Sequence, residues 1–320
     1  MAEYFCIQCI TLIQVKNLTI GEATMQVLDY LNVALFTGPE AGDFLQSQLS
    51  ADIVALEPGM ATFACYCSVR GQVLGLLLVS RSEDGFQVIG SRYLLPSILK
   101  RLQMFVFRAR VEFSLDDETC VYGVLPEDKE LAGNIIRPEG IDLAYLLAKP
   151  GVPPVVGKQS FPEIEIQHQV VWLNNETTEK FIPQMLGFDQ IGAVSYTKGC
   201  YPGQEIVARA RYLGKVKRKP VIVSIEENLL IPAAERVTLR KDSQWLNGTV
   251  VDSAAGAGGG THLFIVAPAE PESVVAEIKY QDHAYRCATT WQTQPGSASP
   301  VSAGSYMPSP SLFSSSVPSQ

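Results

Sequence analysis

The octet KGCYPGQE, residues 198–205, constrains the local fold of this chain more than any other segment. Its Pro-Gly pair predicts a type II turn, because proline presets φ at the second position and glycine supplies positive φ at the third. Residues 205–213 predict a short helix that ends at Gly214, with a carboxylate in the first turn, where it suits the helix dipole. Cys200 is therefore expected just ahead of a turn and a helix start.

Two features of this segment predict that Cys200 is reactive. Free backbone N–H groups at the expected helix start and the ammonium group of Lys198 both favour a thiolate over a thiol. The alternative is a buried structural cysteine in a tight corner, and the sequence alone leaves it open. We take Cys200 and Lys198 as the candidate catalytic residues.

The composition is that of a globular protein with room for two or three domains. The chain has 320 residues, of which 47% are hydrophobic and 18% charged, enough to bury a sizeable core. Its net charge of −8 argues against indiscriminate nucleic-acid binding by the whole surface. Residues 198–219, however, hold seven basic side chains against Glu205 alone, a local charge of +6. A basic segment in an acidic chain suggests an anionic partner at that place. The alternative explanation of these charges is a helix face that is simply solvated.

The cysteines and the apolar segments indicate a soluble, cytoplasmic protein in a reducing environment. Seven cysteines are an odd number without the spacing of a disulfide framework. The pair Cys6 and Cys9 stands alone, so a four-ligand zinc site is not expected. The first basic residue is Lys16, which argues against a secretory signal. The longest apolar run, 73–79, is too short to span a bilayer, so no membrane partner is expected.

The first half of the chain predicts an α+β arrangement. A helix is expected to open at residues 38–40, because Gly-Pro-Glu places proline in its first turn and apolar residues follow at helical spacing. The other expected elements are a hairpin of 61–68 and 72–81, a strand at 86–89, a helix over 94–105 and a strand at 110–115. From 118 to 162 the pattern weakens, since six prolines interrupt it.

The second half predicts a small antiparallel β-barrel. Short strands separated by turns are expected at 219–225, 236–239, 248–252, 262–267, 274–280 and 285–290. Residues 1–24 are expected to form an extension of open role. Residues 292–320 are rich in Ser, Pro and Gly and are expected to be a disordered tail.

The octet and the motifs around it resemble the signature of the YgfZ family, folate-binding proteins related to the T-protein (aminomethyltransferase) of the glycine cleavage system. The motif FIPQ at 181–184 precedes the octet at the family's spacing, and GAVSY at 192–196 leads into it. VAR at 207–209 and GKVKR at 214–218 follow in the expected order. Residues 44–52 resemble the family's first helix. The likeness covers the chain from about 29 to about 291.

This resemblance implies a fold and a division into domains. The expected fold is a T-protein-like multidomain α+β fold, with ferredoxin-like α+β portions and a small antiparallel C-terminal β-barrel. Residues 25–213 are expected to form the folate-binding region, as two intertwined subdomains of which the second is shortened around 115–165. Residues 214–291 are expected to form the barrel.

The resemblance also implies a function. The protein is expected to bind tetrahydrofolate or a related reduced folate and to support iron–sulfur enzyme assembly or repair and iron–sulfur-dependent tRNA modification, through Cys200. Its expected partners are iron–sulfur client or assembly proteins, with tRNA reached indirectly. The candidate folate-binding residues are Phe181, Gln184, Gln204, Glu205 and Arg209. Structural alternatives exist for these residues. Phe181 could be an aromatic core residue, the amides of Gln184 and Gln204 could satisfy loop backbone groups, and Arg209 could form a surface ion pair.

The chain departs from the family pattern at the expected folate site. The relatives place an acidic residue on the second hairpin strand, but residues 72–77 contain no carboxylate. Gln167 stands where a carboxylate pairs with the pterin ring in relatives, with Glu165 as a nearby substitute, and Gly187 stands where relatives often have Asn. A general base or cation stabiliser is thus missing, which argues against aminomethyl transfer but leaves folate binding open.

Two alternative functions remain. A tetrahydrofolate-dependent one-carbon (aminomethyl) transferase would need Glu205 or Asp189 as its base. An RNA-binding module would use the basic cluster at 215–219, although that cluster has no interleaved aromatic side chains.

Overall fold

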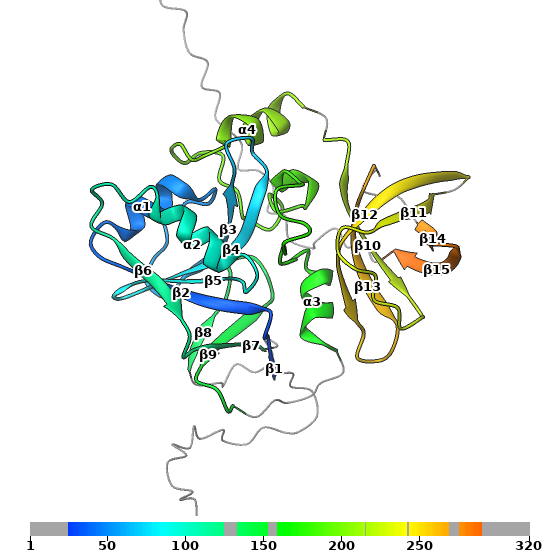
Figure 1. Cartoon of the computed structure of the whole chain (residues 1–320), viewed down its shortest axis with the longest axis horizontal. Helices are drawn as coiled ribbons and strands as arrows, with labels where there is room; N and C mark the ends of the chain where they lie inside the picture. The colour runs from blue at the N-terminus through cyan, green and yellow to red at the C-terminus, as the bar shows by residue number, and fades with distance from the viewer. Residues whose placement is uncertain are drawn as a thin grey trace, which may run out of the picture.

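A computed structural model describes residues 25–124, 133–152, 159–214, 216–241, 243–268 and 275–289. The expected extension at 1–24 and tail at 292–320 lie outside these residues. Within the described part, two open sheets and a closed barrel, with short helices around them, make up the fold (Figure 1). The predicted fold class, an α+β protein with a C-terminal β-barrel, is confirmed.

The first sheet has the strand order β3-β4-β5-β2-β6 and is antiparallel throughout. Its strands are β2 (Leu31–Thr37), β3 (Ala61–Cys67), β4 (Val73–Ser82), β5 (Gly85–Ser91) and β6 (Glu112–Asp116). The central strand β4 is buried from Val73 to Ser80, so it reads as a continuous apolar run rather than an alternating one. The predicted hairpin is present as β3 and β4.

Two helices accompany this sheet. Helix α1 (Ala41–Gln48) follows β2, and helix α2 (Leu95–Gln103) follows β5. The buried side chains of α2 recur every three to four residues, which is the spacing of one helix face: Leu95, Ile98, Leu99 and Leu102. Helix α2 was expected over 94–105, and it ends two residues earlier, at Gln103.

The second sheet has the order β1-β7-β9-β8 and comes largely from the segment without a clear pattern. Its strands are β1 (Met25–Val27), β7 (Cys120–Val124), β8 (Asn134–Ile136) and β9 (Ala144–Ala148). Helix α3 (Phe161–Gln167) follows and was not predicted, because Pro162 looked like a breaker. Ser160 accepts a hydrogen bond from the N–H of Glu163, and the Glu163 side chain bonds back to Ser160 N–H, so a capping box starts the helix.

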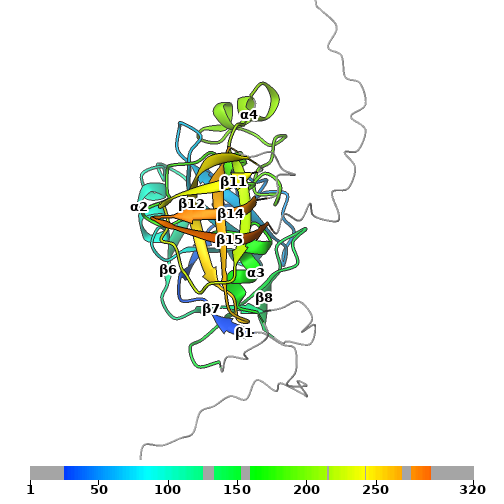
Figure 2. The same ribbon diagram turned by 90° about the vertical axis from the view of Figure 1, so that its right-hand side faces the viewer.

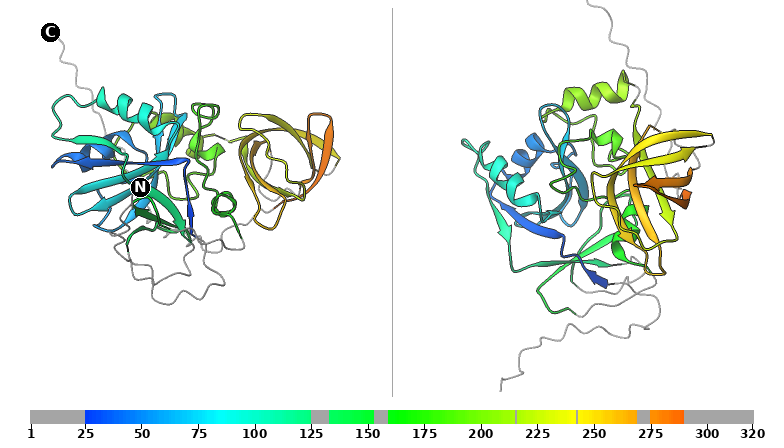
Figure 3. Two further views of the ribbon diagram at one scale, coloured as in Figure 1. Left: turned by 60° about the horizontal axis from the view of Figure 1, so that its bottom comes forward. Right: turned by 45° about the vertical axis from the view of Figure 1, so that its right-hand side comes forward.

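The C-terminal strands close into a barrel of order β10-β13-β12-β11-β14-β15, as predicted. They are β10 (Lys219–Ile225), β11 (Arg236–Lys241), β12 (Gln244–Ala255), β13 (Thr261–Ala267), β14 (Val275–Tyr280) and β15 (His283–Thr289). Figure 2 faces the barrel, and the left panel of Figure 3 looks along it. The barrel has its own apolar core, separate from the larger core that the two open sheets share.

Helix α3 lies between the open sheets and the barrel (Figures 1 and 3). Ser160 Oγ donates to the carbonyl of Ala255 at 2.7 Å, and Glu163 Oε1 lies 3.0 Å from His262 Nε2. The N–H of Ala257 donates to the other Glu163 oxygen at 3.2 Å. These polar contacts join the barrel to the rest of the molecule.

Among the described residues, no helix combines the length and the apolar character that crossing a lipid bilayer requires.

Candidate functional site

The octet forms the predicted turn and leads into helix α4 (Gln204–Tyr212). Gly203 has φ 81° and ψ 0°, and the N–H of Gln204 donates to the carbonyl of Tyr201 at 3.2 Å. Both observations match a type II turn with glycine at its third position. The helix ends at Tyr212, one residue before the predicted end at 213, and the chain then enters the barrel (Figure 1).

The turn packs directly on the tip of the β3–β4 hairpin, and two glycines make this contact possible. A Cβ atom on Gly203 would lie 2.3 Å from the carbonyl oxygen of Ser68 and 2.7 Å from Gly71 Cα. A Cβ atom on Gly71 would lie 2.9 Å from Ile206 Cβ on α4. Only glycine fits at such separations, so the backbone of the hairpin tip fixes the position of the turn.

Cys200 is exposed at the start of this turn, whereas Cys65 and Cys67 on β3 are buried. Burial raises the pKa of the Cys65 thiol well above its ordinary value, which keeps that sulfur protonated. The alternative of a buried structural cysteine therefore does not hold for Cys200. Its thiol is accessible to a partner, and its catalytic use stays a prediction.

Lys198 is buried, and its ammonium group holds the end of helix α1. Its Nζ donates to the carbonyls of Gln46, Leu49 and Ala51, at 2.5 Å for Leu49 and 3.1 Å for Ala51. The last carbonyls of a helix have no partner within the helix, so a cation there satisfies them and suits the dipole. Burial lowers the pKa of Lys198 to about 8. These contacts give Lys198 a structural role, and its catalytic role stays a prediction.

Two of the predicted folate-binding residues are buried. Phe181 belongs to the main core, and its carbonyl accepts a hydrogen bond from the N–H of Val73 at 2.8 Å. Gln184 lies on the short 3-10 helix Pro183–Met185, and its Nε2 donates to Tyr196 Oη at 3.1 Å and to the carbonyl of Val207 at 2.8 Å. The Gln184 amide thus joins this short helix to α4.

The other three lie on helix α4. Gln204 is partly exposed, with its Nε2 3.5 Å from the carbonyl of Lys198. Glu205 and Arg209 are exposed and form an ion pair one helical turn apart, with 3.6 Å between Arg209 Nη2 and Glu205 Oε1. The structure therefore does not bring all five residues to one cavity, and their folate contacts remain predictions.

A cavity of about 460 Å³ lies at one side of Gln184, beside the last turn of α4 and the lead-in to β10. Its charged lining comes from Asp189, Arg211, Lys217 and Lys219. The Gln184 Oε1 atom is buried and has no hydrogen-bond partner among the described residues. The three cations of the cavity fit a ligand that carries carboxylates. Lys215, part of the predicted basic cluster, lies outside the described residues.

Glu165, the proposed substitute for the missing pterin carboxylate, is enclosed elsewhere. It accepts hydrogen bonds from Tyr30 Oη at 2.6 Å, Tyr145 Oη at 2.8 Å and Trp172 Nε1 at 2.8 Å. Burial raises its pKa to about 7, against the opposing effect of these donors. The burial of Glu165 could not be predicted from local sequence, because Tyr30 and Tyr145 come from other segments of the chain. Gln167 is partly exposed on the same helix.

Comparisons with known proteins agree with these motifs. No family model matches the chain. An uncharacterised protein of Haemophilus influenzae is 30% identical over 237 residues, which cover 72% of this chain and 83% of the relative. A protein of Edwardsiella ictaluri named tRNA-modifying protein YgfZ is 24% identical over 290 residues, covering 80% and 87%. A YgfZ of Escherichia coli O7:K1 is 26% identical over 286 residues, covering 78% and 88%.

The fold has a counterpart among solved structures. The crystal structure of the glycine cleavage system aminomethyltransferase T from Bartonella henselae superposes with a TM-score of 0.62 at 14% identity. The alignment covers 84% of this chain and 85% of that one, so the likeness extends over the open sheets and the barrel together. With the octet, the FIPQ motif and relatives that match most of their length, the chain is a member of the YgfZ family.

Proposed function

We propose that this protein is a folate-binding accessory factor that supports iron–sulfur enzymes and the modification of tRNA, and that it acts through Cys200. The observation that carries the proposal is the exposed Cys200 thiol on a turn that two glycines lock against the β3–β4 hairpin. The relatives named tRNA-modifying proteins support the tRNA part of the proposal. The expected cytoplasmic location agrees with a role in tRNA modification.

A single exposed thiol suits a transient bond rather than a stable metal site. One cysteine cannot hold an iron–sulfur cluster alone, and no group of three metal-ligating side chains occurs among the described residues. In a thiol–disulfide exchange, the Cys200 thiolate attacks one sulfur of a disulfide on a client protein. The S–S bond breaks and the second sulfur leaves as a thiolate, so the step needs no external oxidant.

The test is complementation of cells that lack the protein. We expect wild type to restore tRNA nucleosides whose modification requires an iron–sulfur enzyme, and Cys200→Ser to fail at the same protein level. Cys120→Ser, at a partly exposed cysteine on β7, is the matched control and should restore them fully. Full activity of Cys200→Ser would remove the cysteine from the mechanism.

The folate part of the proposal rests on the T-protein-like fold and on the chemistry of the 460 Å³ cavity. Arg211, Lys217 and Lys219 would hold the carboxylates of the folate's glutamate tail. A reduced folate bound there would supply a carrier for one-carbon units. Two contacts position Arg211 for this role. Its Nη1 atom lies 3.8 Å from Asp189 Oδ2, and its guanidinium carbon lies 4.4 Å from the centroid of the Tyr196 ring.

Titration with tetrahydrofolate tests this assignment. We expect Arg211→Ala to weaken binding about tenfold or more, since it removes a charged contact of at least 1.4 kcal/mol. Arg209→Ala decides whether the exposed pair on α4 also contributes, as the sequence predicts. Arg236→Ala, at an exposed position on the barrel, is the control. Equal affinity of all four proteins would contradict the assignment.

A second candidate is aminomethyl transfer to tetrahydrofolate, which the fold of the Bartonella enzyme favours. Strand β4 opposes it, because its residues from Val73 to Val79 are apolar. The remaining candidate bases are Asp189, paired with Arg211, and Glu205, paired with Arg209. Turnover of an aminomethyl donor with tetrahydrofolate, lost in Asp189→Asn or Glu205→Gln, would establish this candidate. Folate binding without turnover would favour the first.

A further inference from the structure

The turn that follows helix α2 exposes three large apolar side chains in succession. Met104 is 64% exposed, Phe105 40% and Phe107 85%. Single exposed apolar residues are ordinary, but a group of three within four residues indicates a contact surface. None of them belongs to the Cys200 turn or to the cavity at Gln184.

The same segment is strongly basic in an acidic protein. Residues 100–111 contain four basic side chains and no acidic one, whereas the whole chain has a net charge of −8. Arg110 Nη2 lies 3.0 Å from Glu40 Oε1, so the charge of Arg110 is already paired within the protein. Lys100 and Arg108 are exposed, and they flank the exposed apolar residues in the sequence. We call this exposed segment the α2 face: Lys100, Met104, Phe105, Phe107 and Arg108.

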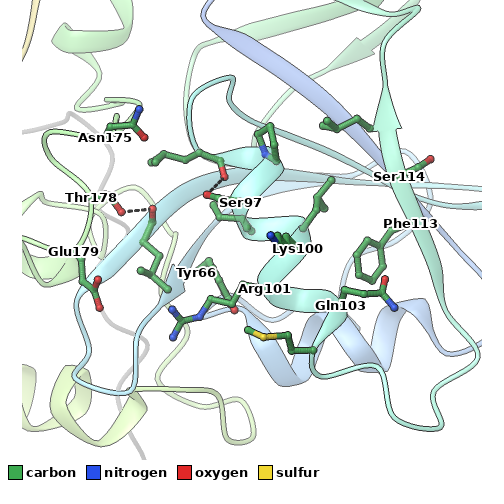
Figure 4. Close-up of a pocket in the computed structure, with 17 residues that line it drawn as sticks. Tyr66, Ser97, Lys100, Arg101, Gln103, Phe113, Ser114, Asn175, Thr178 and Glu179 are labelled. Carbon is green, nitrogen blue, oxygen red and sulfur yellow. Dashed lines mark hydrogen bonds between the residues drawn. The ribbon is translucent and has the colours of Figure 1, made fainter.

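A cavity of about 950 Å³ opens beside the α2 face. Its volume is within the range of about 300–1,000 Å³ that small-ligand sites occupy. The walls are mostly apolar, from Leu94, Ile98, Met104, Phe113 and Leu115, and polar groups stand around them (Figure 4).

Charged side chains of both signs line this cavity: Lys100 and Arg101 from helix α2, and Glu179 from a loop. Figure 4 shows Arg101 on α2 and Glu179 on the loop that follows α3, with Thr178 beside it. Glu179 has φ 59°, in the left-handed region, and its N–H donates to the carbonyl of Val73 at 2.8 Å. The backbone of Glu179 is thus held by β4, and its exposed carboxylate lies at the cavity edge. An apolar slot with an acceptor and a guanidinium at its edge matches the needs of a nucleobase.

We propose that the α2 face binds single-stranded RNA and that the adjoining cavity takes one unstacked base. Bases stack on exposed aromatic rings while cations follow the phosphates, which is how single-stranded nucleic acid is bound without a sequence code. Phe105 and Phe107 provide the rings, and Lys100 and Arg108 the cations. The proposal rests on the proposed role in tRNA modification, and it identifies where the RNA is bound.

The charges favour RNA over a second copy of the chain. In a two-fold symmetric dimer the same patch meets itself, so Lys100 and Arg108 of one copy would face the same cations of the other. RNA phosphates instead neutralise them and release counterions.

Fluorescence anisotropy with a labelled single-stranded oligoribonucleotide and an unmodified tRNA transcript tests the proposal. We expect the double variant Lys100→Glu/Arg108→Glu to lose about tenfold or more in affinity and to lower the slope of log K against log salt by about 2. Phe107→Ala should lose about fivefold or more for the single strand. Because Phe107 is 85% exposed, this substitution removes little packing, and circular dichroism checks the fold.

Matched controls are Trp245→Ala, an exposed aromatic residue on the barrel, and Arg236→Glu, an exposed cation there. Both should bind RNA as wild type does. The proposal is overturned if wild type does not bind RNA, if the α2 variants bind as well as wild type, or if the controls weaken binding equally. Sedimentation that shows a wild-type dimer and a Phe107→Ala monomer would also overturn it.

The Cys200 assignment is tested separately. Cys200→Ser should bind RNA as wild type does, and Phe107→Ala should leave the alkylation rate of Cys200 unchanged. Loss of the RNA result therefore leaves the complementation result for Cys200 standing, and the reverse also holds.

Discussion

The Lys198 ammonium group donates a hydrogen bond of 2.5 Å to the carbonyl of Leu49, which lies 149 residues away in sequence. The contact ties the Cys200 segment to the end of helix α1. The charge of Lys198 therefore interacts with backbone oxygens, whereas the sequence predicts that it acts on the Cys200 sulfur.

Lys198→Met should lower the free energy of unfolding by about 2–3 kcal/mol, because it leaves buried carbonyls without their charged donor. Urea unfolding measures the change. Lys180→Met, at an exposed lysine close in sequence, should change it by less than about 0.5 kcal/mol. Equal effects of the two substitutions would show that the three carbonyl contacts do not stabilise the fold.

Gly203→Ala should destabilise the protein by several kcal/mol. Its φ of 81° is unfavourable for alanine, and the new methyl group would meet Ser68 O at 2.3 Å. Gly192→Ala is the matched control, because Gly192 has φ 76° but no atom within 4 Å of its Cβ position. It should cost only about 1 kcal/mol of backbone strain. The difference between the two midpoints in urea isolates the contact with the hairpin tip.

The buried carboxyl group of Glu165 should make stability depend on pH. Burial raises its pKa from 4.5 to about 7, so the folded state binds this proton more tightly than the unfolded state. The resulting stabilisation is complete below pH 4.5 and is lost as the pH rises through about 7; the total loss is about 3 kcal/mol. Asp252, raised to about 6 by burial, contributes in the same direction.

Glu165→Gln tests the source of this dependence. The amide stays neutral and keeps an oxygen acceptor for Tyr145 and Trp172, so we expect a flatter profile of unfolding free energy between pH 5 and pH 8. Urea unfolding at each pH measures it. Parallel profiles for wild type and variant would show that another group titrates.

Alkylation should separate the cysteines by accessibility. In the native protein iodoacetamide should modify Cys200 at least about tenfold faster than Cys65 or Cys67, because those two react only after local unfolding. Mass spectrometry of the labelled peptides gives the rates, and urea should make them converge. Slower reaction of Cys200 than of Cys65 would contradict its exposed position.

Local patterns in the sequence were sufficient for the elements that carry a strong period or turn signal. Helix α2, the β3–β4 hairpin, the type II turn and most barrel strands are of this kind. Helix α3 is not predicted, because a proline near its start resembles a helix breaker, although the Ser160–Glu163 capping box is a helix signal.

Contacts between segments far apart in the chain could not be predicted from local sequence patterns. Strand β1 pairs with β7, about a hundred residues later, and three residues of strand give almost no pattern. The roles of Lys198 and Glu165 depend on partners that only the fold brings close. The α2 face is not predicted for another reason. The sequence predicts a helix as far as Phe105, whereas the structure has an exposed turn after Gln103.

The glycine contacts at the hairpin tip also determine how a client must approach. Since the turn that follows Cys200 has no room to slide on the Ser68–Gly71 backbone, the main chain that carries the thiol stays in place. The incoming molecule has to bring its own reactive atom to the surface, on a projecting loop or a loosened end. We therefore expect client proteins to present an exposed loop or chain end to Cys200, not a reactive group at the bottom of a cleft.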